Sequence, residues 1–156
     1  MGVCSSGADP FCYRTSKMKL TENFYLIEFR CKDGTLVPEA LIPVVTELAQ
    51  NLQVIRDELT SKIGKDCPIN INSAYRTSSH NREIGGSTRS QHLRGTAADI
   101  WAGRKRRDGT KEYFVSPSDL HGIIEDLIKS GKIKQGGLGK YNSFTHYDIR
   151  GTRARW

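Results

Sequence analysis

The sequence predicts a single α+β domain with a small sheet, and three observations lead to that fold class. Its 156 residues are enough for one hydrophobic core but not for two. Segments with helical periodicity and short segments of alternating polarity follow one another in the order helix, strand, strand, helix, strand. No internal repeat is visible, and no apolar run approaches the roughly 18 residues that a membrane-spanning helix needs.

The first helix is predicted over residues 38–63. Pro38 suits its first turn, and Gly64 suits its end. Apolar residues recur between them at intervals of three and four, which places them on one stripe of an amphipathic helix: Leu41, Val45, Leu48, Leu52, Ile55, Leu59 and Ile63. We expect this stripe to form part of the core.

Two strands and a short helix are predicted next. In residues 67–76, Ile69 and Ile71 alternate with asparagines, which indicates a strand with one buried face. The polar stretch that follows predicts turns and a short helix before Gly85. Residues 95–102 are small and apolar enough for a central strand.

A second amphipathic helix is predicted over residues 118–129, with Ser118 as its N-cap. The glycine-rich residues 136–142 predict a turn, and residues 143–151 alternate in polarity as a strand does.

The net charge of the sequence indicates which classes of partner this protein could bind. A net charge of +7 and an isoelectric point near 9.4 favour an anionic partner, which could be nucleic acid, a lipid headgroup or an acidic cell-wall polymer. The basic residues gather partly in residues 103–111, which we interpret as an exposed, solvated loop. A nucleic-acid surface on this run remains an alternative, although interleaved aromatic residues are missing from it.

The chain is predicted to consist of a flexible N-terminal extension, residues 1–17, and one domain, residues 18–156. No signal peptide is visible. The four cysteines, Cys4, Cys12, Cys31 and Cys67, lack the spacing of a zinc ribbon or a disulfide framework, so we interpret them as free thiols. A disulfide between the first two is the alternative.

Three residues form a candidate metal site: His92, Asp99 and His146. A catalytic zinc ion takes three protein ligands from histidine and carboxylate side chains and keeps one position open for water. Neighbouring strands could bring these residues together although they lie far apart in the sequence. Strand alternation also places Asp148 on the same face as His146.

The sequence resembles the zinc D-Ala-D-Ala carboxypeptidases and related murein endopeptidases. The segment "SQHLRGTAAD", Ser90 to Asp99, fits S-x-H-x-x-G-x-A-x-D at all five fixed letters, and "INSAYRTSSHNREIGG" and "SFTHYDIRG" resemble that family's flanking segments. The similarity covers roughly residues 19–156 and is greatest to small single-domain forms encoded by bacteria and their phages. It implies a hedgehog-like zinc peptidase fold, with a mainly antiparallel sheet flanked by helices.

The resemblance also implies roles for individual residues. It makes His92, Asp99 and His146 the ligands of a Zn²⁺ ion and Arg76 the residue that grips the substrate. A guanidinium suits this task because its rigid fork of donors matches a carboxylate or an oxyanion. Ser90 is expected to orient the loop or to bind the substrate.

The general base departs from the pattern of better-known relatives. Many of them have an acidic residue three positions before the last ligand or a histidine two before it, but Ser143 and Phe144 stand at those positions here. Asp148 is the nearest acidic candidate for a catalytic base. The alternative for Asp148 is a structural role, bonded to Arg150 or to the backbone.

The resemblance implies zinc-dependent hydrolysis of an amide bond in peptidoglycan stem peptides, of the carboxypeptidase, endopeptidase or endolysin type. The expected partner is a stem peptide rather than nucleic acid, and the expected state is a monomer with no integral membrane segment. The expected site of action is the bacterial cell wall or periplasm, with synthesis in the host cytoplasm for a phage-encoded form. A zinc-containing binding module without hydrolytic activity is the alternative.

Overall fold

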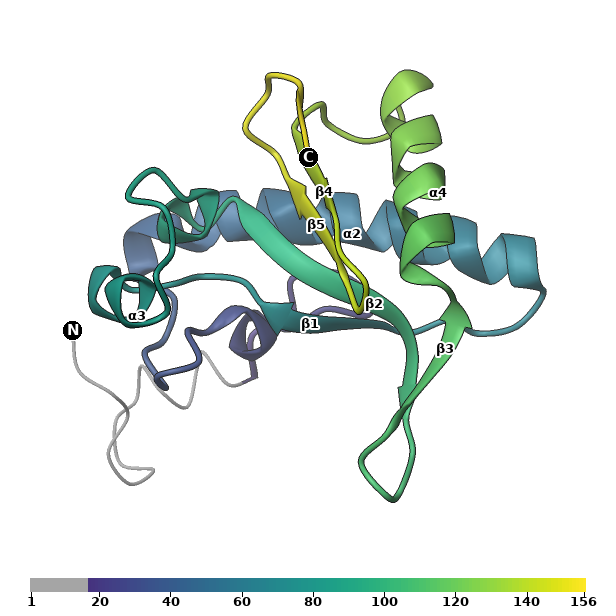
Figure 1. Ribbon diagram of the computed structural model, residues 1–156, viewed down its shortest axis with the longest axis horizontal. Coiled ribbons are helices and arrows are strands. Elements are labelled where there is room, and N and C mark those ends of the chain that lie inside the picture. Colours follow the sequence, from purple (N-terminus) through teal and green to yellow (C-terminus); the bar gives the residue numbers. More distant parts are fainter. Residues whose placement is uncertain (1–16) are drawn as a thin grey trace.

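The computed structural model describes residues 17–156, and it contains one mixed sheet with helices packed against it (Figure 1). The predicted extension therefore lies, except for Lys17, outside the described residues. The elements are, in order, η1 (Leu26–Phe29), η2 (Glu39–Leu41), α2 (Ile42–Ile63), β1 (Ile69–Ser73), α3 (Ser78–Glu83), η3 (Gln91–Arg94), β2 (Ala97–Lys105), β3 (Lys111–Val115), α4 (Pro117–Lys129), β4 (Gly137–Lys140), β5 (Thr145–Asp148) and β6 (Ala154–Arg155).

Helix α2 confirms the predicted amphipathic stripe. Its apolar face is buried in the core and consists mainly of Val45, Leu48, Leu52, Ile55 and Leu59. The helix starts later than predicted, because residues 39–41 form the 3-10 turn η2 and Pro43 occupies the first turn of α2, where a missing N–H costs nothing. It ends as predicted at Gly64, whose φ of 72° is left-handed.

The sheet has the strand order β1-β2-β5-β4-β6, and β3 also pairs with β2. All of these pairs are antiparallel except β4 with β6. The predicted α+β class with a mainly antiparallel sheet is therefore confirmed. Within the described residues, β1 is an end strand of this order and has a strand partner on one side only.

The two faces of the sheet differ in chemistry. Ile100 of β2 and Tyr147 of β5 are fully buried in the hydrophobic core, and Figure 1 shows α2 passing behind these strands. Successive residues of a strand point to opposite faces, so Asp99 and His146 point away from that core. The alternation of the sequence thus puts Asp99, His146 and Asp148 on one face of the sheet.

Two strands occur where turns or loops were predicted. The predicted loop at residues 103–111 is wrong at both ends, because β2 continues to Lys105 and β3 starts at Lys111. The predicted turn at residues 136–142 is mostly strand β4. Gly137 and Gly139 have no positive φ, and they are present because a Cβ at either position would collide with neighbouring side chains.

Helix α4 begins at Pro117 and is capped by Ser116, whose hydroxyl accepts a hydrogen bond from the N–H of Asp119 at 3.1 Å. The predicted cap at Ser118 was therefore wrong. Proline is favoured at the first helical position, which moves the cap to the residue before it.

The other predicted features are found close to their expected places. Strands β1 and β5 are shorter than the segments predicted for them, and helix α3 lies before Gly85 as predicted. Cys31 and Cys67 are buried free thiols, while Cys4 and Cys12 lie outside the described residues. In the described part of the chain no helix is both long and apolar enough to cross a membrane.

Candidate metal centre

The structure brings the three predicted metal ligands together on the outer face of the sheet. Asp99 of β2 and His146 of β5 are directly paired across the two strands. The Nδ1 atom of His146 lies 3.0 Å from Asp99 Oδ1, and the Nε2 atom of His92 lies 3.3 Å from Asp99 Oδ2. One ligand atom from each residue lies within 4.8 Å of the other two.

Local geometry before β2 orients His92. Turn η3 carries this residue and ends at Gly95, whose φ is 71° and whose N–H bonds back to the carbonyls of Gln91 and His92. The Nδ1 atom of His92 lies 2.7 Å from the carbonyl oxygen of Ala74. Because a carbonyl only accepts, Nδ1 carries a proton, and Nε2 is the ring nitrogen that faces Asp99.

Ser90 lies at the start of the same turn. Its hydroxyl accepts a hydrogen bond from the N–H of His92 at 3.3 Å, so it caps η3. This contact corresponds to the expected role of orienting the loop. Binding of substrate by Ser90 stays a prediction.

Asp148 lies beneath His146 and is completely buried. Its Oδ2 atom lies 2.8 Å from His146 Nε2 and accepts a hydrogen bond from Nη2 of Arg150 at 2.7 Å. Its Oδ1 atom accepts from Nε of Arg150 at 2.8 Å and from the N–H of Gly137 at 2.9 Å. Both oxygens are therefore occupied by donors, and these contacts match the structural role that was the alternative for Asp148.

The electrostatics of the cluster favour anionic carboxylates. Burial raises the pKa of Asp99, but hydrogen bonds from His146 and His92 outweigh it and hold that pKa well below its usual range. Burial likewise raises the pKa of Asp148, and the hydrogen bonds from Arg150 and His146 reverse the effect and lower it. Burial lowers the pKa of His146, but its bonds to Asp148 and Asp99 raise it above the ordinary value.

These residues fit a catalytic zinc site by donor type and arrangement. Two imidazole nitrogens and one carboxylate oxygen make a three-ligand set, and such sites leave a position for water or substrate. The second nitrogen of each histidine is held by an oxygen, from Ala74 for His92 and from Asp148 for His146. Partners of this kind commonly orient metal-ligating histidines.

Arg76 lies beside the cluster, with Asp99 close enough to influence its charge. Its Nη1 atom donates to Asn81 Oδ1 at 2.9 Å, and its Nη2 atom lies 3.4 Å from Ser73 Oγ. Its Nε atom is buried and has no hydrogen-bond partner. Among the described residues the guanidinium forms no ion pair, so its positive charge is not neutralised by a carboxylate.

Sequence reasoning missed Asn81, which holds Arg76 in place. Its side chain is buried, and its Nδ2 atom donates to the carbonyls of Gly86 and Ser87 at 3.3 and 2.9 Å. A Cβ at Gly86 would collide with Asn81 Oδ1, so the glycine permits the close approach. The only signal in the sequence was the glycine pair after a short helix, which we had interpreted as a turn.

Sequence reasoning also missed an aromatic cluster beside His146. The ring of Trp156 lies 4.9 Å from that of His146, and its Nε1 atom donates to the hydroxyl of Tyr141 at 2.8 Å. Tyr141 stacks on Phe144 with a centroid distance of 4.4 Å. Isolated aromatic residues near the end of a sequence give no hint that they meet at a metal site.

The other two histidines, His80 and His121, are not part of the metal-ligand group found in the described residues. Ser143 is exposed, and its carbonyl accepts a hydrogen bond from the hydroxyl of Tyr113 at 3.0 Å. Position 143 therefore provides no carboxylate that could act as a general base.

Comparison with known proteins agrees with this geometry. The model of the family described as Peptidase M15 matches residues 19–148, which is most of the chain and includes all three candidate ligands. No curated protein matches the chain.

Proposed function

This chain belongs to the Peptidase M15 family, and from that premise we propose that it is a zinc-dependent hydrolase of amide bonds in peptidoglycan stem peptides. Membership implies a metallopeptidase. The proposal rests on one observation: His92, Asp99 and His146 converge beside the guanidinium of Arg76, whose Nε atom has no hydrogen-bond partner. The reaction is of the D-Ala-D-Ala carboxypeptidase or murein endopeptidase type, and an endolysin role fits the small domain.

The proposed zinc ligands are His92 Nε2, a carboxylate oxygen of Asp99 and His146 Nδ1. Zinc bound by such residues acts as a Lewis acid that polarises the scissile carbonyl and makes water nucleophilic near neutral pH. Asp99 is ready to bind a cation because its hydrogen bonds keep it ionised. Both histidines are nearly inaccessible to solvent, which limits their freedom to turn away.

Arg76 is the proposed substrate-binding and catalytic cation. Its planar donor fork suits the terminal carboxylate of a peptide or the oxygen that becomes negative when the amide is attacked. Asn81 holds one end of the guanidinium without neutralising it, because an amide oxygen carries no net charge. A carboxylate at this place would compete with the substrate.

We propose that Asp148 positions His146 rather than removing a proton from water. The carboxylate is completely buried and surrounded by donors, so it accepts no further proton without losing a hydrogen bond. A carboxylate bound to the outer nitrogen of a ligating histidine fixes its orientation and increases its basicity.

Analysis of digested peptidoglycan tests the proposal. Purified protein is stripped of metal, reloaded with zinc and incubated with muropeptides, whose masses are then measured. We expect a mass loss that identifies the broken bond, only with zinc, and not with His92→Ala. His121→Ala is the matched control because this histidine lies on α4 outside the ligand group, and it should retain activity.

One second function is favoured by a specific observation. Ser143 stands where many relatives have the base, and Asp148 is occupied by donors, which would suit a zinc-containing binding module without hydrolysis. Zinc-dependent product from the wild type would exclude this module. Zinc binding and peptide binding without any product would establish it instead.

The proposed place of action is the bacterial cell wall, and the proposed state is a monomer. The net charge of +7 would favour adsorption to an anionic wall. Sedimentation of the protein with purified wall material, and its release by salt, would check this part of the proposal.

A further inference from the structure

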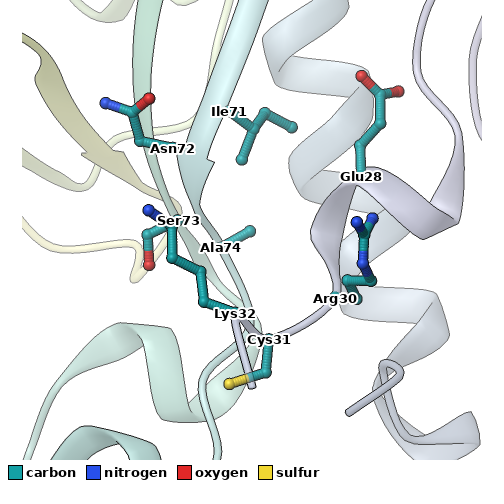
Figure 2. A pocket seen from close by; sticks show the side chains of 8 residues that line it. All are labelled: Glu28, Arg30, Cys31, Lys32, Ile71, Asn72, Ser73 and Ala74. Carbon is teal, nitrogen blue, oxygen red and sulfur yellow. The ribbon is translucent and has the colours of Figure 1, made fainter. Parts of the chain in front are cut away.

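A groove follows the free edge of β1 and leads away from the metal centre. It consists of a cavity of about 240 Å³ and an adjoining cavity of about 340 Å³, which share Glu28, Arg30, Ile71 and Asn72. In Figure 2, Glu28 and Arg30 form one wall, and Asn72, Ser73 and Ala74 lie on the other. We call these two cavities the β1 groove.

One end of the β1 groove touches the candidate metal centre. Ser73 lines the groove, is paired with Asp99 across the two strands and lies 3.4 Å from the Nη2 atom of Arg76. Ala74 also lines it, and the carbonyl of this residue holds His92. A substrate bound at the metal centre would therefore have the groove open beside it.

Both cavities of the groove contain basic residues. Lys32 lines the first cavity, and Lys105 lines the second. The ammonium of Lys111 lies 4.9 Å from the ring centre of Trp101, which also lines the second cavity. Lys105 and Lys111 are directly paired across β2 and β3. Burial lowers the pKa of Lys111, and the positive charges of Lys105 and Lys32 lower it further.

These charges are not balanced within the described residues. Lys32, Lys105 and Lys111 form no ion pair there. Glu28 is the one acid of the groove walls, and its Oε2 atom is turned to the N–H of Tyr25 at 2.7 Å. Three like charges held together cost free energy, which an anionic ligand would recover.

We propose that the β1 groove binds the carboxylates of an acidic stem peptide at a distance from the scissile bond, with Lys32, Lys105 and Lys111 as the binding cations. This inference rests on the proposed function and adds the substrate class, a peptide longer than the terminal dipeptide. Between Ser73 and Asn70 an extended chain covers about 10 Å, or roughly three residues. Lys105 lines the same cavity as Asn70, so we expect Lys105 and Lys111 to meet carboxylates at least about three residues beyond the Ser73 end of the groove.

A peptide suits the groove better than a nucleic acid does. Binding of single-stranded nucleic acid relies on exposed aromatic rings on which bases stack. The aromatic residue of this groove, Trp101, is only 1% exposed and is covered by Tyr113 and Lys111. Charge is therefore available to a ligand here, but a stacking surface is not.

The test is a direct binding measurement with two synthetic stem pentapeptide analogues, one with free side carboxylates and one with those carboxylates amidated, in which non-hydrolysable ketomethylene links replace the amides that could be cleaved. Both are titrated calorimetrically into the full zinc-loaded protein at low salt. The wild type should bind the acidic peptide about tenfold more tightly, as expected for three exposed charge pairs. The triple variant Lys32→Gln, Lys105→Gln, Lys111→Gln should lose this preference.

A matched variant controls for net charge. Lys62→Gln, Lys129→Gln, Lys132→Gln removes the same charge from α2, α4 and the segment after α4, and it should keep the tenfold preference. Equal affinity of the wild type for both peptides, or a preference that survives in the groove variant, would overturn the inference. Groove-dependent binding of an oligonucleotide or polyphosphate without binding of the acidic peptide would overturn it as well.

The two proposals fail in different ways. The binding measurement does not depend on turnover. A protein that prefers the acidic peptide but cleaves no muropeptide would refute the proposed hydrolase activity and support the proposed carboxylate binding by the groove. Zinc-dependent cleavage without a preference for carboxylates would refute the proposed role of the groove and support the hydrolase activity.

Discussion

Replacement of Asp148 by asparagine is the sharpest test of how the metal centre is built. The two side chains have nearly the same shape, so Asp148→Asn removes a charge without opening a cavity. Because the amide keeps only one oxygen, Arg150 retains at most one of its two short bonds, of 2.8 and 2.7 Å, and loses the negative charge that pairs with it. The amide NH2 group also faces either His146, which contacts Oδ2, or the N–H of Gly137, which donates to Oδ1.

The expected loss of stability follows from the burial of this pair. Breaking a buried ion pair costs about 3–5 kcal/mol. The side chain of Arg150 is 27% exposed, so water can partly solvate its charge in the variant. We therefore expect the free energy of unfolding to fall by about 3 kcal/mol, the lower end of this range. In a domain of this size each kcal/mol shifts the melting temperature by roughly 2–4 °C, so we expect a decrease of about 6–12 °C.

The metal affinity should also fall. Loss of a partner that orients a ligating histidine typically weakens metal binding or activity about 10–100-fold. Calorimetric titration with zinc at a temperature where the variant is folded measures this effect separately from stability. Asp126→Asn is the control, because this aspartate is exposed on α4, and it should change neither property.

A different outcome would refute the reasoning. If Asp148→Asn kept the wild-type melting temperature and zinc affinity but lost catalysis by several orders of magnitude, Asp148 would be the general base. A shift in the acidic limb of the pH profile of kcat would point the same way.

Three further predictions concern other parts of the site. In the metal-free protein the raised pKa of His146 means that its imidazolium stabilises the fold below the unfolded pKa, near 6.5, and that this contribution disappears as the pH rises through the folded pKa. Zinc displaces that proton, so the affinity of the protein for zinc should increase with pH. Calorimetric titrations in buffers of different ionisation enthalpy should detect the released proton. A zinc affinity that does not change with pH would contradict this prediction. Gly137→Ala puts a Cβ against buried side chains and should cost about 1–3 kcal/mol in urea unfolding, whereas Gly122→Ala, with open space on α4, should stabilise by about 0.5–1 kcal/mol. Asn81→Ala frees the guanidinium of Arg76 and should raise KM more than it lowers kcat, and steady-state kinetics with unchanged KM would count against that positioning role.

Much of the fold and part of the site could be predicted because the relevant signals are local. The stripe of α2 repeats with the helical period, and the spacing of His92 and Asp99 is carried by one continuous motif. The alternation of β5 placed His146 and Asp148 on one face, as their contact of 2.8 Å confirms. Signals of this kind depend only on residues close together in the chain.

Strand β4 was missed because its glycines are typical of turns. In the structure they are needed for close packing, since a Cβ at Gly137 would meet Asp148 and one at Gly139 would meet Trp156. The support of Arg76 by Asn81 was missed for a similar reason, because nothing in the sequence marks a buried amide as the partner of a particular guanidinium.

The sequence by itself determined the amphipathic helices, the alternation of β1 and β5 and the identity of the candidate ligands. Only the tertiary structure decided that β5 pairs with β2 in the register that sets His146 against Asp99, that Arg150 and Gly137 enclose Asp148, and that a basic groove runs along β1. The reason is physical: periodicity is a property of neighbouring residues, whereas register and enclosure depend on how segments far apart in the chain bury their surfaces against one another.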